Sequence, residues 1–263
     1  MPVRAFVFMS DPFASSRRKI AWAKKNITNL KRQITKFLQQ DDLYTVFTEP
    51  DPHNPQQTIH KMRLAKHFPD GLSERTGDIV NNLREALDHT IYALSKFKKP
   101  SITPGEAYFP FASDAVHFEN TLNGRCKYLP QELRALIRGY EPYKGGSEAL
   151  WALNQVCGAN KHAILVPVGT VATMAEVRVE GTGFWCMPHI PSWDWTKQEM
   201  ELITVRQEAK LRANFHFSFY VAFGEIDGVA GKAAIPALDT FVEMVETIIS
   251  EIEAESKRLG IVK

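Results

Sequence analysis

The sequence has little cysteine and no long apolar run. Its three cysteines, Cys126, Cys157 and Cys186, are odd in number and never form a C-x-x-C pair. This pattern favours neither a disulfide framework nor a zinc site, so we expect no metal and a reducing, cytoplasmic compartment. No stretch approaches the roughly 20 apolar residues of a membrane span. The apolar patch at residues 5–9 is also too short for the core of a signal peptide, and we expect no membrane association.

The chain also lacks a strong excess of charge of either sign. Its formal net charge is +2, with 44% hydrophobic and 24% charged residues over 263 positions. These proportions are ordinary for a globular protein and exclude disordered, collagen-like and disulfide-scaffold classes. A nearly neutral chain neither favours nor excludes nucleic acid as a partner, so the placement of the charges has to decide.

Helical periodicity dominates the first half and the C-terminal end of the chain. Residues 15–40 and 73–96 carry apolar side chains at steps of three and four, which predicts two long packed helices. A shorter helix is predicted over residues 130–138, with a proline at its start, and another is predicted after the capping residue Ser147. Thr240 and Glu243 form a capping-box pattern, which predicts a last helix from there to about residue 258.

Alternation with a period of two marks the strands. Residues 44–48 and 58–64 read as a hairpin, and five further runs follow at 164–168, 171–179, 184–187, 202–206 and 215–223. We therefore expect an α+β fold. Residues 1–162 form a mainly helical region, and residues 163–263 form an antiparallel sheet of about five strands with a long C-terminal helix. We expect the two parts to pack as one domain.

Pairs of basic residues recur every seven positions along the first helix, at 17–18, 24–25 and 31–32. Such rows are typical of RNA binding, because phosphate neutralisation dominates non-specific affinity. The last helix is acidic, however, with Glu243, Glu246 and Glu253 among its residues. Two helices with apolar seams and opposite flanking charges can instead pack against each other, and we favour this interpretation.

The residues most suggestive of chemistry lie on the second helix. Arg84 and His89 form an R-x4-H pattern beside Asn82, Glu85 and Asp88. RNA cleavage without a metal needs a cation to hold the phosphate and an imidazole to move protons. The planar guanidinium of arginine matches phosphate oxygens, and histidine titrates near neutrality.

A purely structural interpretation accounts for the same residues. Arg84 with Asp88, and Glu85 with His89, are spaced i, i+4 and can form helix-surface pairs. A five-residue step turns a helix by about 140°, so Arg84 and His89 point in different directions. A composite site would need a second chain or another helix, and the pattern alone also occurs by chance.

Residues 77–94 resemble a helix of a widespread, poorly characterised bacterial family, which reads approximately G-D-x-x-x-N-L-R-x-A-L-D-H. The family also shows F-P, P-Y and N-x-x-K-H motifs. Here they correspond to Phe109-Pro110, to Pro142-Tyr143 and, more weakly, to Asn160-Lys161-His162 or to Asn154 with the same Lys-His pair. The resemblance covers about the first two thirds of the chain, and the family itself implies little about function.

The R-x4-H helix is also similar to that of HEPN-superfamily ribonucleases. This resemblance implies a helical bundle that dimerises to bring two Arg/His pairs together, with Arg84 holding phosphate and His89 transferring protons. Glu85 follows Arg84 where those enzymes often carry Asn, Asp or His, and the β-rich half is not part of their minimal bundle.

We therefore expect a metal-independent endoribonuclease that needs no cofactor, acts on RNA and forms a homodimer. Arg84 and His89 would be catalytic, and Asn82, Asp88, Lys161 and His162 would bind substrate. Lys161 and His162 can also be explained without a role in substrate binding, because cations at the C-terminal end of a helix interact favourably with the helix dipole. The alternative is a non-catalytic protein that binds a ligand or partner and in which the polar cluster is structural.

Overall fold

The structure is a computed structural model, and it describes residues 11–69, 71–159, 164–180, 186–189, 192–194 and 196–262. The chain divides into two compact units. The helical unit comprises described residues up to Lys31, from Ser73 to Ile164 and from Gly224 onward. The strand unit comprises the stretches from Arg32 to Leu72 and from Leu165 to Phe223. The units therefore alternate along the sequence, whereas the sequence analysis places one boundary between residues 162 and 163.

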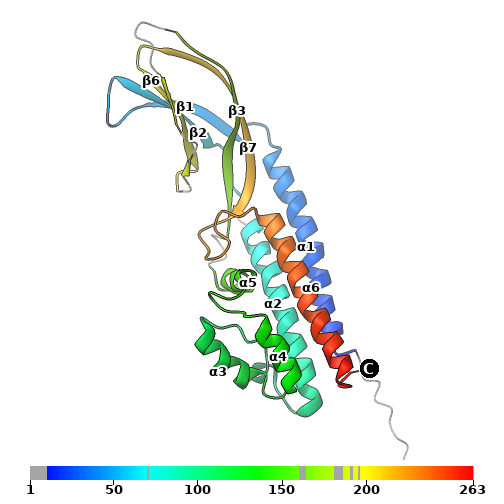
Figure 1. Cartoon of the computed structure of the whole chain (residues 1–263). Helices are drawn as coiled ribbons and strands as arrows, with labels where there is room; N and C mark the ends of the chain where they lie inside the picture. Colours follow the sequence, from blue (N-terminus) through cyan, green and yellow to red (C-terminus); the bar gives the residue numbers. More distant parts are fainter. Residues whose placement is uncertain are drawn as a thin grey trace, which may run out of the picture. The chain divides into compact units, whose positions relative to one another are not determined.

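Three long helices lie side by side in the helical unit: α1 (Ala14–Leu38), which continues into the strand unit, α2 (Gly71–Lys98) and α6 (Ala234–Arg258) (Figure 1). Their predicted apolar seams are buried, as the helical periodicity requires. The buried seam residues are Ile20, Ala23, Ile27 and Leu30 of α1, Ile79, Leu83, Leu87, Ile91 and Leu94 of α2, and Leu238, Phe241, Val245, Ile248 and Ile252 of α6.

Shorter elements complete the helical unit: a 3₁₀ turn (Pro104–Glu106), α3 (Ala115–Arg125), α4 (Gln131–Gly139) and α5 (Glu148–Gly158). The start of α4 after Pro130 and the Ser147 cap of α5 are confirmed, since the Ser147 hydroxyl accepts a hydrogen bond from the Leu150 amide. α3 was not predicted from the sequence. Its signal is the N-cap Asp114, whose carboxylate accepts from the His117 backbone N–H at 2.9 Å.

The predicted start of the last helix is wrong. α6 begins at Ala234, and its N-cap Ala233 makes no side-chain hydrogen bond. Thr240 lies inside the helix, where its hydroxyl donates to the Pro236 carbonyl. Pro236 is compatible with this earlier start because the first-turn amides of a helix have no intrahelical acceptor. The Thr240/Glu243 pair is therefore part of the helix surface.

The strand unit contains two antiparallel sheets. The five-stranded sheet has the order β1 (Tyr44–Pro50), β2 (Gln57–Leu64), β6 (Glu199–Arg206), β4 (Cys186–Pro188), with β5 (Trp193–Asp194) also paired to β6. The predicted hairpin is confirmed as β1 and β2, which pair with Tyr44 opposite Leu64. β3 (Leu165–Glu180) and β7 (Lys210–Phe223) form a separate two-stranded sheet. The two runs expected at 164–168 and 171–179 are one continuous strand, β3.

The α+β class is thereby confirmed, with the long C-terminal helix and the antiparallel pairing that the sequence predicts. In the C-terminal half, the described residues form five strands, which are shared between the two sheets. β2 joins β6 in the larger sheet, with Thr58 opposite Val205. The core of the strand unit draws on both sheets and includes Met62, Val168, Trp193, Ile203 and Ala222.

Candidate functional site

α2 carries all the described candidate residues and presents them on different sides. Its apolar stripe is buried, so Arg84, Asp88 and His89 emerge at the edges of that stripe, where each is half-buried. A five-residue step is a turn of about 140°. In agreement with that angle, Arg84 and His89 line different hollows of the helical unit.

His89 lies in the wall of an open cavity of about 870 Å3. The start of α1, the C-terminal part of α2 and the segment around the 3₁₀ turn enclose it. Its wall contains polar and charged side chains together with aromatic, proline and alanine side chains. The polar contributors are Asp11, Ser15, Arg18, Asp88, His89 and Lys96, together with the hydroxyl-bearing Tyr92.

The imidazole of His89 is held by α1. Its Nδ1 lies 2.8 Å from the hydroxyl oxygen of Ser15. Burial lowers the pKa of His89, and the nearby cations Lys19 and Arg18 lower it further, while Glu85 acts in the opposite direction. Lys19 and Glu85 form an ion pair of their own at 2.5 Å. His89 is therefore biased toward the neutral form, in which it can accept a proton.

The neighbouring carboxyl group of Asp88 is shifted in the opposite direction. Burial raises its pKa to about 6, although Arg84 and a hydrogen bond from the Phe109 amide at 2.9 Å both favour the charged form. The Phe109-Pro110 loop forms a strap across the core, because both residues are buried. Asp88 and His89 thus line one cavity, and burial shifts the pKa of Asp88 upward and that of His89 downward.

Arg84 occupies a different environment. Its guanidinium carbon lies 5.4 Å from the centroid of the Phe111 ring, and its Nε is buried without a hydrogen-bond partner among the described residues. Arg84 lines two smaller hollows of about 630 and 640 Å3, one with Asn154 and Asp227 and the other with Arg125. A phosphate at His89 would therefore not meet Arg84 of the same chain in either of these hollows.

The remaining predicted residues make no convergent cluster in the described part of the chain. The side-chain amide of Asn82 donates to the Asp78 carbonyl of its own helix at 2.8 Å. Lys161 and His162 lie outside the described residues. Burial raises the pKa of the Cys157 thiol to about 12, which is unfavourable for the thiolate that a nucleophile requires.

Sequence reasoning missed Ser15, Tyr92 and Lys96, and it noted Arg18 only as part of the basic rows. No spacing rule links residue 18 to residue 89, because their proximity depends on how α1 packs on α2. A buried hydrogen bond of 2.9 Å between the hydroxyls of Ser16 and Thr90 fixes that packing. Ser15 and His89 occupy the adjacent positions on the same two helices, which explains why they meet.

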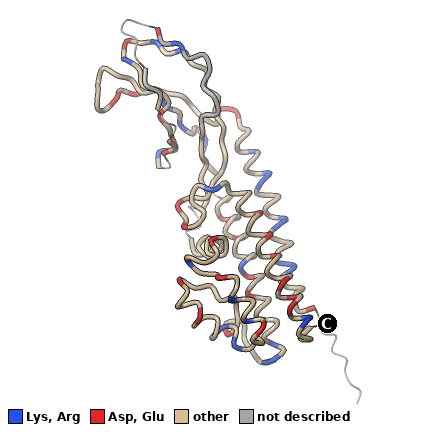
Figure 2. The backbone as a smooth tube through the Cα atoms, viewed as in Figure 1, with Lys and Arg blue, Asp and Glu red and all other residues tan. Residues whose placement is uncertain are grey.

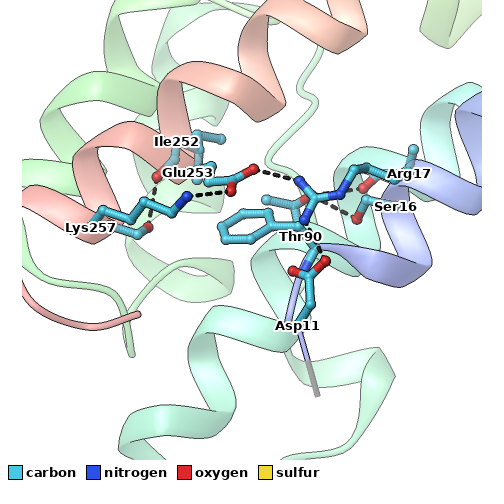
Figure 3. A network of polar contacts seen from close by, with 10 residues as sticks. Asp11, Ser16, Arg17, Thr90, Ile252, Glu253 and Lys257 are labelled. Carbon is cyan, nitrogen blue, oxygen red and sulfur yellow. Dashed lines mark hydrogen bonds and ion pairs between the residues drawn. The ribbon is translucent and has the colours of Figure 1, made fainter. Parts of the chain in front are cut away.

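The other flank of α1 faces α6, as the packing interpretation of the basic rows predicts. Arg17 donates to Glu253 at 2.5 Å and also pairs with Asp11 (Figure 3). One heptad later, Lys24 pairs with Glu246 at 2.6 Å. The first residue of each of these two basic pairs therefore contributes to helix packing, and the charge interpretation is confirmed for this flank.

Comparison of the chain with protein-family models, with curated proteins and with solved structures finds no match. No helix among the described residues has the length and apolar character needed to cross a membrane. The described side chains also contain no group of three or more His, Cys, Asp or Glu residues placed to hold a metal ion.

Proposed function

We propose that the protein is a metal-independent endoribonuclease whose acid–base groups are His89 and Asp88. One observation supports this proposal above the others: the two side chains line the same open cavity, and their pKa values are shifted toward each other. The raised pKa of Asp88 favours the protonated carboxyl group, and the lowered pKa of His89 favours the neutral imidazole. A proton acceptor and a proton donor at one site are what phosphodiester cleavage requires.

The proposed reaction is attack of an RNA 2′-hydroxyl on the adjacent phosphorus. Nδ1 of His89 is engaged by Ser15, so Nε2 accepts the 2′-hydroxyl proton. The bond from O2′ to phosphorus forms, and the bond from phosphorus to O5′ breaks as protonated Asp88 donates its proton to O5′. The products are a 2′,3′-cyclic phosphate and a 5′-hydroxyl group.

In this proposal Arg18 and Lys96 neutralise the phosphate, because both cations line the cavity that holds His89. Cations that are already in place where negative charge develops on the phosphate in the transition state contribute strongly to rate enhancement. Arg84, the phosphate holder that the HEPN resemblance implies, lines other hollows than His89, so in this proposal a second copy of the chain brings its Arg84 to His89. A homodimer therefore belongs to this proposal as its second part.

A second candidate is binding without catalysis, and the composition of the cavity wall favours it. Tyr92, Phe97 and several prolines offer apolar surface beside Arg18 and Lys96. Such a wall suits an anionic ligand with an apolar part. This candidate predicts that the protein retains such a ligand and leaves RNA intact.

The test is incubation of the purified chain with RNA in excess EDTA, beside a His89→Ala variant prepared identically. We expect cleavage by the wild type and a loss of about 10²–10⁴-fold in the variant. An RNA with a single 2′-deoxy position should resist cleavage at that position only. Equal cleavage by both proteins would contradict the proposal, and no cleavage by either would favour the binding candidate.

An Arg84→Ala variant separates the two parts of the proposal. If one chain suffices, the variant cleaves as the wild type does. If a second copy supplies Arg84 to His89, the variant loses activity, and mixing it with His89→Ala should restore part of that activity in mixed dimers.

A further inference from the structure

One face of α1 remains exposed after its other faces are accounted for. Ile20, Ala23 and Ile27 are buried in the core, and Arg17 and Lys24 pair with α6. On the α2 side, Ser15 contacts His89 and Lys19 pairs with Glu85. The exposed face lies between these flanks, and Figure 2 shows basic positions recurring along the helix.

Arg18, Trp22 and Lys25 form this exposed face, which we call the Trp22 face. Their spacing of four and three residues places all three within an arc of about 60°, and Arg18 and Lys25 lie about 10 Å apart along the axis. Trp22 is 41% exposed, which is unusual for so large an apolar side chain on a helix rich in charge. Among the described residues, neither Arg18 nor Lys25 forms an ion pair with a carboxylate.

The Trp22 face is continuous with the proposed active site. Arg18 belongs to both, because it lines the cavity and lies close enough to His89 to lower the pKa of the imidazole. From Arg18, the next exposed groups along α1 are the indole of Trp22 and the ammonium group of Lys25. A linear polymer that extends out of the cavity past Arg18 would therefore contact first the aromatic ring of Trp22 and then a second cation, Lys25.

We propose that the Trp22 face binds the single-stranded RNA that extends from the His89 cavity. Single strands are bound through cations that follow the backbone and aromatic side chains on which bases stack. The face provides both, with the indole between two unpaired cations. A duplex hides the faces of its bases, so the proposal specifies an unpaired strand as the substrate. It rests on the proposed function for the identity of the polymer.

Binding is measured by fluorescence anisotropy with a labelled 2′-O-methyl RNA of about 12 nucleotides, within the range of about 4–16 nucleotides typical of single-strand sites. The 2′-O-methyl groups prevent cleavage by 2′-hydroxyl attack, so the wild-type chain can be used. We expect Trp22→Ala to weaken binding by about tenfold or more, and Trp22→Phe to restore most of it. Lys25→Gln should reduce the slope of log K against log salt by about 0.7.

Lys31→Gln is the matched control, because it removes the same charge from the same helix about 180° away from Trp22. It should bind as the wild type does. Wild-type affinity in both Trp22→Ala and Lys25→Gln would overturn the proposal. So would equal affinity for a duplex of the same length, or retention on anionic lipid vesicles in place of RNA.

The binding and cleavage measurements together test RNA binding by the Trp22 face separately from ribonuclease activity. If the chain binds RNA through Trp22 but cleaves none in EDTA, the Trp22 face stands and the ribonuclease proposal fails. If Trp22→Ala cleaves and binds RNA as the wild type does, the ribonuclease stands and the Trp22 face fails.

Discussion

Replacing Asp88 by asparagine should stabilise the protein at neutral pH while abolishing the proposed acid. Burial raises the pKa of this carboxyl group from 3.8 to about 6. At about 1.36 kcal/mol per pKa unit, this rise means that ionised Asp88 lowers the free energy of unfolding by up to about 3 kcal/mol above pH 6. The side-chain oxygen of asparagine can still accept the Phe109 amide, so the strap contact is retained.

The pH dependence has a definite sign. A carboxyl group with a raised pKa is protonated in the folded state at a pH where the unfolded chain is ionised. The wild type therefore loses stability as the pH rises from about 4 through 6, and the variant does not lose this contribution. The Asp88→Asn chain should equal the wild type near pH 4 and exceed it at pH 7. The difference amounts to about 2–4 °C in Tm per kcal/mol for chains near this size.

Urea unfolding at several pH values measures this difference, and Asp114→Asn is the matched control. The backbone N–H of His117 holds the pKa of Asp114 down at about 2, so removing that charge should destabilise the chain at neutral pH. The two variants should thus change stability in opposite directions. An Asp88→Asn protein that gains nothing between pH 4 and pH 7 would refute the raised pKa and the acid role derived from it.

Three further changes test the surrounding structure. Phe109→Ala should lower the free energy of unfolding by about 3–5 kcal/mol, because the ring is fully buried in the strap; urea unfolding measures it. Gly169→Ala should cost about 1–3 kcal/mol in thermal or urea unfolding, since its Cβ would lie 2.8 Å from side-chain atoms of Met62 and Trp193. Cys157 should react with a thiol reagent at pH 8 far more slowly than a free thiol, because burial raises its pKa to about 12.

The sequence predicts well those features that depend on local periodicity. The seams of α1, α2 and α6 repeat every three or four residues, and the same residues are buried. Opposite charges on α1 and α6 likewise predict the pairs Arg17–Glu253 and Lys24–Glu246. These signals need no knowledge of the connections between elements.

Features that depend on tertiary placement could not be predicted in the same way. The period of two identifies strands but not their neighbours, so it did not show that β2 pairs with β6 across more than 130 positions of sequence. The R-x4-H pattern identified His89, with Asp88 beside it, and Lys96 lies two turns further along the same helix. Arg18 joins them only because α1 packs on α2. The start of α6 was missed because a capping-box pattern also occurs on helix surfaces.

In the proposed RNA cleavage, His89 accepts a proton and Asp88 donates one. The pH dependence of the single-turnover cleavage rate in excess EDTA tests it most directly. The rate should fall as the pH rises above about 6, because Asp88 loses its proton, and it should also fall at lower pH, where His89 gains a proton. A rate that climbs steadily to pH 8, or that persists unchanged in His89→Ala, would contradict the account.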